Sequence, residues 1–528
     1  DAAGTSAAQI RTARRMTEHS TFDAPRLAVP DRSLSKARMK VGRAAWAARY
    51  YKSFNRDAVM AIAEAIAKAG HAKSADFADL AVSETGYGVV EHKTLKNQLC
   101  THALLDHYRD LDLVTPRIDS ERNIVELPKP AGVVFALAPA TNPVATVYYK
   151  AMLAVLSRNA IVISPHPAAK RVSAQAAQHL AKAAEAAGAP AGLIQCVEEP
   201  SIPLVQDIMA SDKINVIIAT GGTAMVRAAY SSGNPALGVG PGNAVAYVDP
   251  TAKVDAAARC LVDSKSFDNS VLCTNESVVV TLDSNRGNME RALRTAGAHV
   301  CNEADTEKLR NYLFKDENFT LEAIGKSAQW IAEQAGIRVN PSTKILVPIV
   351  TSPGQDDLLF REKLCPVLTL TAAVDFEQAI TFAKHTTKRG AGHSAAFHGD
   401  DALRLVAFSQ DMPVYRVVVN APCSQGAAGF ATHLPPAFTI GTGFAGRSSV
   451  GENVGPHHLV HWTRIAYAKD QPADLASIDL SYVSSDRPVA PVLADHAPRS
   501  NSQAADVTRD ELRQLILEEL RGLKGDVR

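Results

Sequence analysis

The sequence predicts an α/β fold with parallel sheets, and two observations support this prediction. Short apolar runs alternate with alanine-rich helical stretches across the centre of the chain, a pattern typical of βαβ units whose helices cover both faces of a sheet. A second series of strands and helices then extends over residues 263–438. The expected strands occupy residues 132–137, 160–164, 193–197, 215–219, 344–348, 367–371 and 417–420. We therefore expect two α/β domains with a cleft between them.

Composition narrows the class of protein. The 528 residues carry 56 Lys and Arg against 55 Asp and Glu, so a net charge of +1 gives no overall attraction to nucleic acid or to an anionic membrane. The seven cysteines are scattered without a CxxC pair, which indicates a reducing compartment and neither a disulfide framework nor a zinc site. No apolar run nears the ~18 residues of a membrane span. We expect a cytoplasmic protein.

The chain before the first strands is expected to be largely helical. Residues 1–34 are polar and form an N-terminal arm, and apolar residues recur at three- and four-residue steps from residue 35 to about 107. A β-hairpin is predicted at 113–128, with strands at 113–118 and 123–128. The first domain is expected to cover residues 35–263.

Cys273 is the strongest single candidate for chemistry. It lies on a loop between a helical pattern, residues 254–266, and the β-branched run at 277–281. A thiol on such a loop is ordered but reachable, which suits a nucleophile that nearby donors or a base activate. The alternative is a small buried hydrophobic residue, which is what most free cysteines are.

Three further motifs are candidates for binding a cofactor, a metal or a phosphate. Gly441–Gly446 matches GxGxxG, but neither a helical stretch nor a suitably spaced acid follows, so a glycine-rich active-site loop is the better interpretation. His457, His458 and His461 have no acidic or cysteine ligand at a metal-site spacing, and no metal is predicted. Thr220–Thr223 ends a strand and begins a helix, where free N–H groups favour a phosphate. A simple tight turn fits this last stretch equally well.

The C-terminal region combines a linker with a short helix. Residues 471–506 are rich in Pro, Ala, Ser and Asp and are expected to be flexible. Residues 507–528 open with the capping box Thr508–Glu511 and continue with an apolar stripe of leucines and Ile516. Because so short a helix is marginal alone in water, its apolar face needs a partner surface.

A series of ordered motifs between residues 131 and 468 resembles the aldehyde dehydrogenase superfamily. The motifs are Thr141-Asn-Pro143, Ser164-Pro-His-Pro167, Ala219-Thr-Gly-Gly222, Ala229-Tyr-Ser-Ser-Gly233, Pro235-Ala-Leu-Gly-Val-Gly240, Phe267-Asp-Asn269 with Cys273, Glu362-Lys-Leu364, Gly392-His393, Ser424-Gln-Gly426 and Glu452-Asn-Val-Gly-Pro456. Within the superfamily they are most similar to the CoA-acylating branch, including the aldehyde dehydrogenase half of the bifunctional aldehyde-alcohol dehydrogenases and the acylating enzymes of bacterial microcompartments. We expect no iron-dependent alcohol dehydrogenase half, because the chain continues into the linker instead.

The resemblance implies the aldehyde dehydrogenase fold and a role for each site residue. The fold comprises a Rossmann-like cofactor domain, a catalytic thiol domain at residues 264–440, a return at 441–470 and an oligomerisation hairpin. Cys273 would attack the aldehyde, while the Asn142 amide and the Cys273 N–H hold the oxyanion. Glu362 would contact the nicotinamide ribose, although a surface ion pair is its default interpretation. The remaining cofactor-binding residues would be Ser164 and His166 near the adenosine ribose, Gly221 and Gly222 by the pyrophosphate, and Thr223 and Gly240.

The acyl acceptor separates two classes of enzyme within the family. Hydrolytic members carry a glutamate in a Glu-Leu-Gly-Gly motif that activates water, and the matching stretch here, Gly238–Gly240, has no carboxylate. CoA therefore suits the role of acceptor, and His393 would assist its attack or departure, unless His393 is only a buried, hydrogen-bonded histidine. Arg447 would contact a CoA phosphate or an anionic substrate such as sulfoacetaldehyde; a solvent-facing arginine is the alternative.

The remaining expectations concern partners and cofactor. The linker and tail resemble encapsulation peptides, which implies contact with shell proteins in a microcompartment lumen and a short substrate such as propanal or acetaldehyde; docking on the enzyme itself is the alternative. The hairpin implies a homodimer or homotetramer. No acid follows the strand that ends at Ser164, so either NAD or NADP fits. A hydrolytic dehydrogenase and a non-enzymatic cargo or assembly protein are the rival functions.

Overall fold

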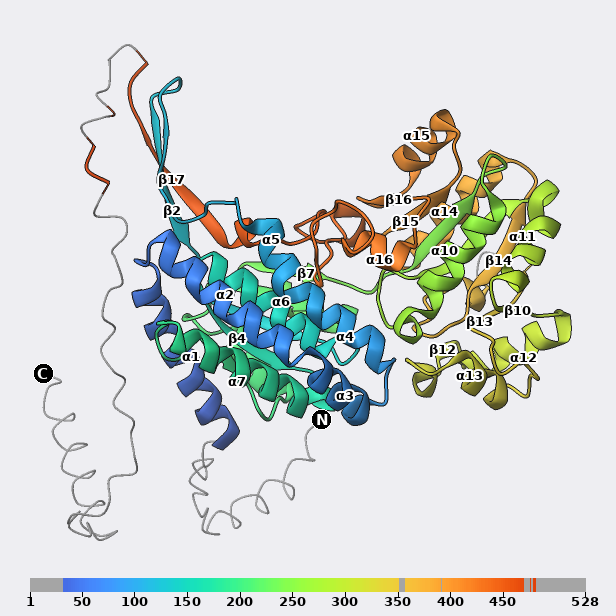
Figure 1. Ribbon diagram of the computed structural model, residues 1–528, viewed down its shortest axis with the longest axis horizontal. Helices are drawn as coiled ribbons and strands as arrows, with labels where there is room; N and C mark the ends of the chain where they lie inside the picture. Colours follow the sequence, from blue (N-terminus) through green and yellow to red (C-terminus); the bar gives the residue numbers. More distant parts are fainter. Residues whose placement is uncertain (1–31, 351–356, 391, 470–474, 476–477, 481–528) are drawn as a thin grey trace, which may run out of the picture. The chain divides into compact units, whose positions relative to one another are not determined.

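The computed structural model describes residues 32–350, 357–390, 392–469, 475 and 478–480 (Figure 1). By internal contacts the chain divides into two units, residues 1–487 and 488–528, and the second lies wholly outside the described residues. The predicted N-terminal arm up to residue 31, nearly all of the linker, and the tail helix therefore stay predictions. Within the described residues, no helix is both long and apolar enough to cross a membrane.

The predicted helical region precedes the first strands. In α2, alanines and β-branched residues at three- and four-residue steps form one buried face, and the Asn55 side chain caps the helix by accepting from the Ala58 N–H at 2.9 Å. The helices are α1 (Arg32–Tyr51), α2 (Arg56–Ala72), α3 (Ser74–Thr85), α4 (Val90–Gln98), a π-helical turn (Leu99–Ala103) and α5 (Leu104–Tyr108). Helix α2 packs against helices of the first sheet layer, which joins this region to the same core.

The first sheet has five parallel strands in the order β5-β4-β3-β6-β7. Every residue of β3 and β4 is buried, as expected for strands that are covered on both faces. The strands are β3 (Val133–Ala138), β4 (Ala160–Pro165), β5 (Ile194–Cys196), β6 (Val216–Thr220) and β7 (Ala236–Val239), and the helices are α6 (Pro143–Leu156), α7 (Lys170–Ala186), α8 (Ile202–Met209) and α9 (Thr223–Tyr230). The order reverses at β3, where parallel α/β sheets bind ligands.

The second sheet also has five parallel strands, in the order β14-β9-β8-β15-β16. Val245 and Tyr247 of β8 pack into one core, and Ala246 and Val248 pack into another, so both faces are covered. The strands are β8 (Ala244–Val248), β9 (Glu276–Leu282), β14 (Thr369–Ala373), β15 (Ala395–His398) and β16 (Val417–Val419), and the helices are α10 (Val254–Ser266), α11 (Asp283–Thr295), α14 (Phe376–Lys388), α15 (Ala402–Asp411) and α16 (Cys423–Ala427). The predicted α/β fold with parallel sheets is confirmed.

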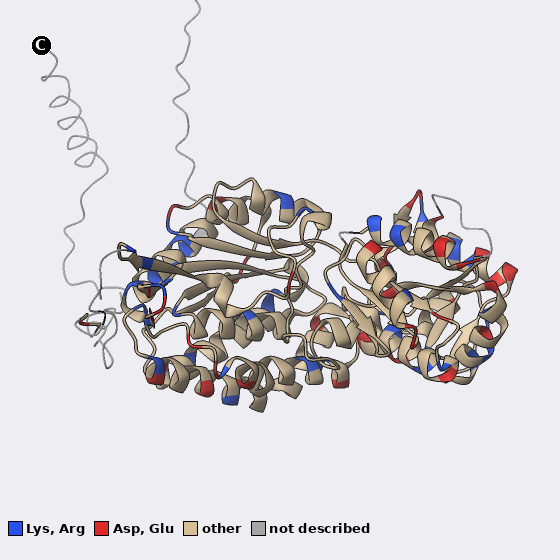
Figure 2. Ribbon diagram, turned by 90° about the horizontal axis from the view of Figure 1, so that it is seen from above, with Lys and Arg blue, Asp and Glu red and all other residues tan. Residues whose placement is uncertain are grey.

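Smaller elements extend this second layer. The parallel pair β10 and β13 and the hairpin of β11 and β12 lie beside two helices. Their bounds are β10 (Ala298–Val300), α12 (Glu303–Leu313), β11 (Phe314–Lys315), β12 (Asn318–Phe319), α13 (Ala328–Gln334) and β13 (Ile345–Val347). Six 3₁₀ turns and one further strand complete the described elements: Pro167–Ala169, Phe267–Ser270, Leu321–Ala323, Leu358–Phe360, Phe444–Gly446, Pro456–Leu459, and β17 (Val460–Ala466). Figure 2 shows basic and acidic residues interspersed over the helices of the protein.

The predicted hairpin forms, with a shorter first strand than expected. β1 (Arg117–Asp119) pairs antiparallel with β2 (Ile124–Pro130), and β17 adds to the other edge of β2. The first strand was expected from residue 113. Instead Val114 packs into the main core and donates its N–H to Asp112 Oδ1, which forms a turn in place of a strand.

Strand β8 shows that the second sheet begins earlier than the predicted start of the second domain at residue 264. It pairs with β9 and β15 although it precedes that position by some twenty residues. The chain thus crosses from one sheet to the other between β7 and β8. The other predicted domain boundaries stay predictions.

Candidate active site

Cys273 lies on the loop that joins α10 to β9, where the sequence predicted it. The preceding 3₁₀ turn is irregular: Asp268, Asn269 and Ser270 all have positive φ, between 50° and 68°. Asn and Asp tolerate this left-handed conformation better than most residues, and such conformations cluster at functional sites. The loop therefore takes a non-regular path immediately before the thiol.

His393 lies directly against the thiol. Its Nε2 is 3.1 Å from Cys273 Sγ, and its Nδ1 is 2.9 Å from Ser394 Oγ. Burial is the main cause that raises the pKa of the Cys273 thiol to about 12, with a further rise from Glu362. Burial also lowers the pKa of His393 to about 3, with a smaller contribution from Arg416. At neutral pH the pair is a thiol beside an uncharged imidazole, so Nε2 can accept a hydrogen bond from the thiol.

A cavity of about 210 Å³ opens beside Cys273. Of the predicted site residues, Asn142, Glu362, Gly221, Gly222 and Gly240 line it together with Cys273. Burial raises the pKa of the Glu362 carboxyl to about 8, against the lowering effects of Lys265 and of the Gly242 N–H. The structure thus brings the predicted nucleophile, amide and carboxyl to one cavity, with His393 fully buried behind the thiol.

A second cavity of about 400 Å³ adjoins the first, because Thr141, Gly221, Gly222 and other residues line both. Ser164 and His166 line it at the carboxyl end of β4. The Ser164 hydroxyl is buried and has no hydrogen-bond partner within the described residues, as expected of a group that awaits a ligand hydroxyl. The residues present therefore fit a dinucleotide that runs across the ends of the strands.

Two of the predicted features, Thr223 and the loop Gly441–Gly446, lie outside the linings of both cavities. Thr223 is exposed and lines neither cavity, because it begins α9 with its side chain in solvent. The glycine-rich loop Gly441–Gly446 also lines neither cavity; instead Arg416 binds the Gly441 carbonyl at 2.7 Å and holds the loop to one side. Arg447 is exposed at the end of this loop, with a φ of 56°.

Glu452 lies beside two of the three histidines that were considered as metal ligands. Its Oε1 is 3.1 Å from His458 Nε2 and 3.8 Å from His457 Nε2, and the three ligand atoms lie within 4.8 Å of one another. The sequence spacing did not indicate this carboxylate, which arrives because the Gly455 N–H donates to His458 Nδ1 and turns the chain back. The group lines neither cavity.

Glycine at position 242 was missed as a site residue. A Cβ atom there would lie 2.2 Å from the Cys273 carbonyl oxygen and 3.2 Å from His393 Cβ, so a side chain would displace the catalytic loop. The sequence shows only one glycine among several in residues 238–242. No local pattern distinguishes it.

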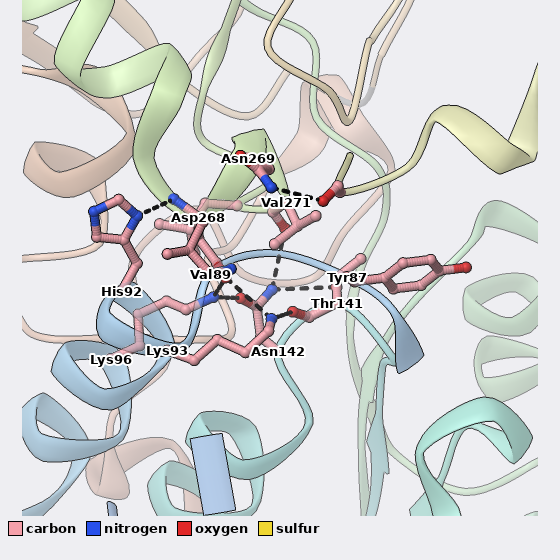
Figure 3. Close-up of polar contacts among 12 residues, drawn as sticks. Tyr87, Val89, His92, Lys93, Lys96, Thr141, Asn142, Asp268, Asn269 and Val271 are labelled. Atoms are coloured by element: carbon pink, nitrogen blue, oxygen red, sulfur yellow. Dashed lines mark hydrogen bonds and ion pairs between the residues drawn. The ribbon is translucent and has the colours of Figure 1, made fainter. Parts of the chain in front are cut away.

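Buried lysines were also missed. Lys150 donates to the carbonyls of Leu137 and Ile218 at 2.6 and 3.1 Å, and to Thr220 Oγ1 at 3.0 Å, at the ends of β3 and β6. Lys93 and Lys96 of α4 reach a buried cluster beside the thiol loop (Figure 3). In sequence Lys93 and Lys96 look like the solvated face of a helix.

Comparison with known proteins places the fold and this site in one family. The model of the aldehyde dehydrogenase family matches residues 16–465. The chain belongs to the aldehyde dehydrogenase family. A curated member, the aldehyde-alcohol dehydrogenase of Clostridium acetobutylicum, is 38% identical over 405 residues, which cover 75% of this chain and 46% of that protein. The chain thus spans about half the length of such bifunctional relatives.

Two other members of the family match over nearly their full length. The acetylating succinate-semialdehyde dehydrogenase of Clostridium kluyveri is 37% identical over 419 residues, which cover 79% of this chain and 92% of that protein. The propionaldehyde dehydrogenase of Rhodopseudomonas palustris, solved with bound CoA and an acylated cysteine, superposes with a TM-score of 0.75 and 27% identity. That match covers 82% of this chain and 97% of the solved chain.

Proposed function

We propose that this chain is a CoA-acylating aldehyde dehydrogenase, which oxidises an aldehyde with NAD(P)+ and transfers the acyl group to CoA. The observation that carries the proposal is the lack, around Cys273, of a carboxylate able to activate water. Among the described residues that line its cavity, the acidic one is Glu362, the expected contact of the nicotinamide ribose, and position 238, where hydrolytic relatives carry their glutamate, is a glycine. The acetylating relative and the CoA-bound, acylated structure are consistent with this activity.

Gly238 gives this argument a steric basis. A Cβ at this position would lie 2.6 Å from the Tyr230 ring and 2.7 Å from Val226, whereas real Cβ atoms keep at least 3.0 Å. The Tyr230 hydroxyl accepts from the Gly238 N–H at 2.9 Å and donates to neighbouring groups, which holds the ring in place. Hydrolytic relatives carry their glutamate at the position of Gly238. The space that a side chain would need there is taken up by the ring of Tyr230.

The site residues divide the reaction among them. Cys273 Sγ forms a bond to the aldehyde carbon while His393 Nε2, 3.1 Å away, accepts the thiol proton. The Asn142 amide stabilises the developing oxyanion, and such a donor is worth about 3 kcal/mol. A nicotinamide cofactor held by Ser164, His166, Gly221 and Gly222 would supply a hydride acceptor, and loss of the hydride would leave the acyl group on Cys273 as a thioester. The thiol of CoA then takes the acyl group and the Cys273 thiol is regenerated. His393 is placed to pass one proton to the Cys273 sulfur, and the second proton is released to solvent.

The test is NADH formation from propanal, with and without CoA, on the wild type and on Cys273→Ala. We expect turnover that requires CoA, yields propanoyl-CoA and disappears in the variant. Turnover that is indifferent to CoA, with free propanoate as the product, would contradict the proposal and identify a hydrolytic enzyme. Thermal melting of the variant shows whether its fold is retained.

The cavity favours a short uncharged aldehyde, with propanal and acetaldehyde first. Its lining beside the thiol is mainly apolar, with Leu272, Val239, Phe438 and Ile440. Arg447 lies outside this lining, so nothing in the described site pairs with the anionic group of sulfoacetaldehyde. A panel of aldehydes compared by kcat/KM tests this order, and a preference for sulfoacetaldehyde would reverse it.

Cofactor choice, assembly and location complete the proposal. Ser164 is followed by no acid, so both NAD and NADP are accepted, and their kcat/KM ratio measures the preference.

The three-stranded sheet of β1, β2 and β17 supports a homodimer or homotetramer, which light scattering would determine. The capping box and apolar stripe of residues 507–528 support binding to shell proteins. Removal of these residues should abolish co-purification with shells while sparing activity.

A further inference from the structure

The ammonium group of Lys96 is buried between Asn142 and Asp268 (Figure 3). Its Nζ donates to Asn142 Oδ1 at 2.5 Å and also to Asp268 Oδ2. The lysine side chain is 1% exposed and that of Asp268 is fully buried. A buried ion pair thus contacts the side chain proposed to hold the oxyanion.

This contact fixes the orientation of the Asn142 amide. An ammonium has three donors and no acceptor, so only the amide oxygen can face it. The Nδ2 group is thereby turned the other way, where it donates to the Val271 carbonyl at 3.3 Å and to Thr141 Oγ1 at 3.2 Å. Val271 and Thr141 both line the cavity of Cys273. Without the ammonium the amide could rotate by half a turn and present its oxygen, which repels an oxyanion.

Asp268 in turn holds Lys96 in place. Its Oδ1 accepts from the Val89 N–H at 2.7 Å, and its Oδ2 accepts from Lys93 Nζ at 3.1 Å. Gly88 allows this approach, since a Cβ there would lie 2.1 Å from Asp268 Oδ1. The carboxylate therefore ties the start of α4 to the loop that carries the thiol.

The energetics indicate that this arrangement serves more than folding. Burying two lysines against one carboxylate costs desolvation, and apolar residues of similar volume usually fill such a space at lower cost. In agreement, burial lowers the pKa of Lys96 to about 8, although Asp268 acts in the opposite direction. An apolar residue could not supply a hydrogen-bond donor directed at Asn142 Oδ1, as Lys96 does.

We infer that Lys96, held by Asp268, is a positioning residue that orients the Asn142 amide with Nδ2 toward the cavity of Cys273. The inference rests on the proposed function, in which that amide stabilises the oxyanion. Lys96 itself touches neither substrate nor cofactor and acts through Asn142.

A double-mutant cycle on kcat tests this dependence. We expect Asn142→Ala to lower kcat by about 10² to 10³, as for other oxyanion donors. Lys96→Met should lower kcat by roughly tenfold or more, with KM for NAD and aldehyde within about threefold of the wild type. The double variant should match Asn142→Ala within about threefold, because Lys96 acts only through this amide. A further tenfold loss in the double variant would overturn the inference.

Two controls separate positioning from other roles. Lys93→Met removes the other lysine from Asp268 but leaves Asn142 Oδ1 paired, so its kcat should fall less than that of Lys96→Met. The charge of Lys96 is the weakest of the influences that lower the pKa of the Cys273 thiol, so the rate at which iodoacetamide alkylates Cys273 should fall much less than kcat in Lys96→Met. A decrease as large as that of kcat would mean that Lys96 acts on the thiol and would contradict positioning. If Lys96→Met fails to fold, Lys96→Gln retains an N–H donor and should keep more activity than Lys96→Ala.

The outcomes also separate this inference from the proposed function. Failure of the wild type to show CoA-dependent turnover refutes the proposed function, whatever the variants do. Loss of activity in Asn142→Ala with full activity in Lys96→Met refutes only the positioning role. Equal melting temperatures of Lys93→Met and Lys96→Met would show that a difference in kcat does not come from the fold.

Discussion

The Cys273 thiol should ionise only at high pH in the ligand-free protein, and a pH series of its alkylation tests this. Its pKa of about 12 has two main causes: burial, and the negative charge of Glu362. Only the thiolate reacts with iodoacetamide. The alkylation rate should therefore keep rising from pH 7 to 10 without a plateau, by about tenfold per pH unit except around pH 8, where ionisation of Glu362 reduces the slope.

The size of the effect follows from comparison with a free thiol, whose pKa is near 8.5. At pH 8 a pKa of about 12 leaves roughly 10⁻⁴ of Cys273 as thiolate, some 10³-fold less than a free cysteine. A more basic thiolate is more nucleophilic, with a Brønsted coefficient of about 0.4–0.5, which restores roughly 30-fold. Cys273 should thus react about 10²-fold more slowly than free cysteine at pH 8.

The assay is site-resolved, because seven cysteines are free in the described structure. Peptide mapping by mass spectrometry gives the rate at Cys273, with Cys273→Ala as the blank. Glu362→Gln is the matched variant: Glu362 is charged above its pKa of about 8, so the variant should react faster than the wild type above pH 8 and equally below it. A plateau below pH 9, or a rate above that of free cysteine, would refute the reasoning.

Three further predictions concern single positions. Gly242→Ala should lower kcat by at least about tenfold. Its Cβ would lie 2.2 Å from the Cys273 carbonyl oxygen and would displace the loop that carries the thiol, and a displacement of about 1 Å is costly to catalysis. An unchanged kcat would contradict this close approach. Gly238→Ala should lower the free energy of unfolding by about 1–3 kcal/mol in denaturant titrations, owing to the clash with Tyr230, whereas Gly287→Ala, in open space on α11, should raise it by about 0.5–1 kcal/mol. Ser164→Ala should leave stability unchanged, since its hydroxyl has no partner in the described structure, while KM for NAD rises several-fold; a loss of stability with unchanged KM would show that the hydroxyl is structural.

The sequence predicted the architecture well wherever burial is uniform. Strands such as β3 and β4 are apolar throughout, so their pattern identifies them without knowledge of their neighbours. β7 and β8 are separated by only the stretch 240–243, and this short connection concealed the crossing between the sheets. The hairpin's first strand was predicted to begin at residue 113 but begins at Arg117 for a different reason. Val114 packs into the core, and this tertiary contact cannot be recognised from the local sequence.

The site was predictable where residues carry a recognisable chemistry. Cys273, Asn142, Glu362 and His393 were named from the sequence, and the structure brings all four together. Gly242 could not be recognised, because its importance is a distance to the Cys273 carbonyl that no spacing encodes. The same holds for Lys96, since a helix of polar residues gives no sign of which lysine is buried.

Buried lysines recur around this site and share one chemical role. Lys265 donates to Asn275 Oδ1 at 2.5 Å and to the Lys363 carbonyl at 3.0 Å, and Lys363 donates to the carbonyls of Leu359 and Arg361 at 2.5 and 3.0 Å. These oxygen atoms lie on irregular segments beside the thiol loop and the Glu362 segment, where no sheet ladder supplies a donor. A long side chain with three donors can satisfy several such oxygens from one position, and it adds direction that apolar packing lacks. These hydrogen bonds thus offset the cost of desolvating the ammonium wherever the backbone keeps a non-regular path. The backbone around Cys273 follows such a path.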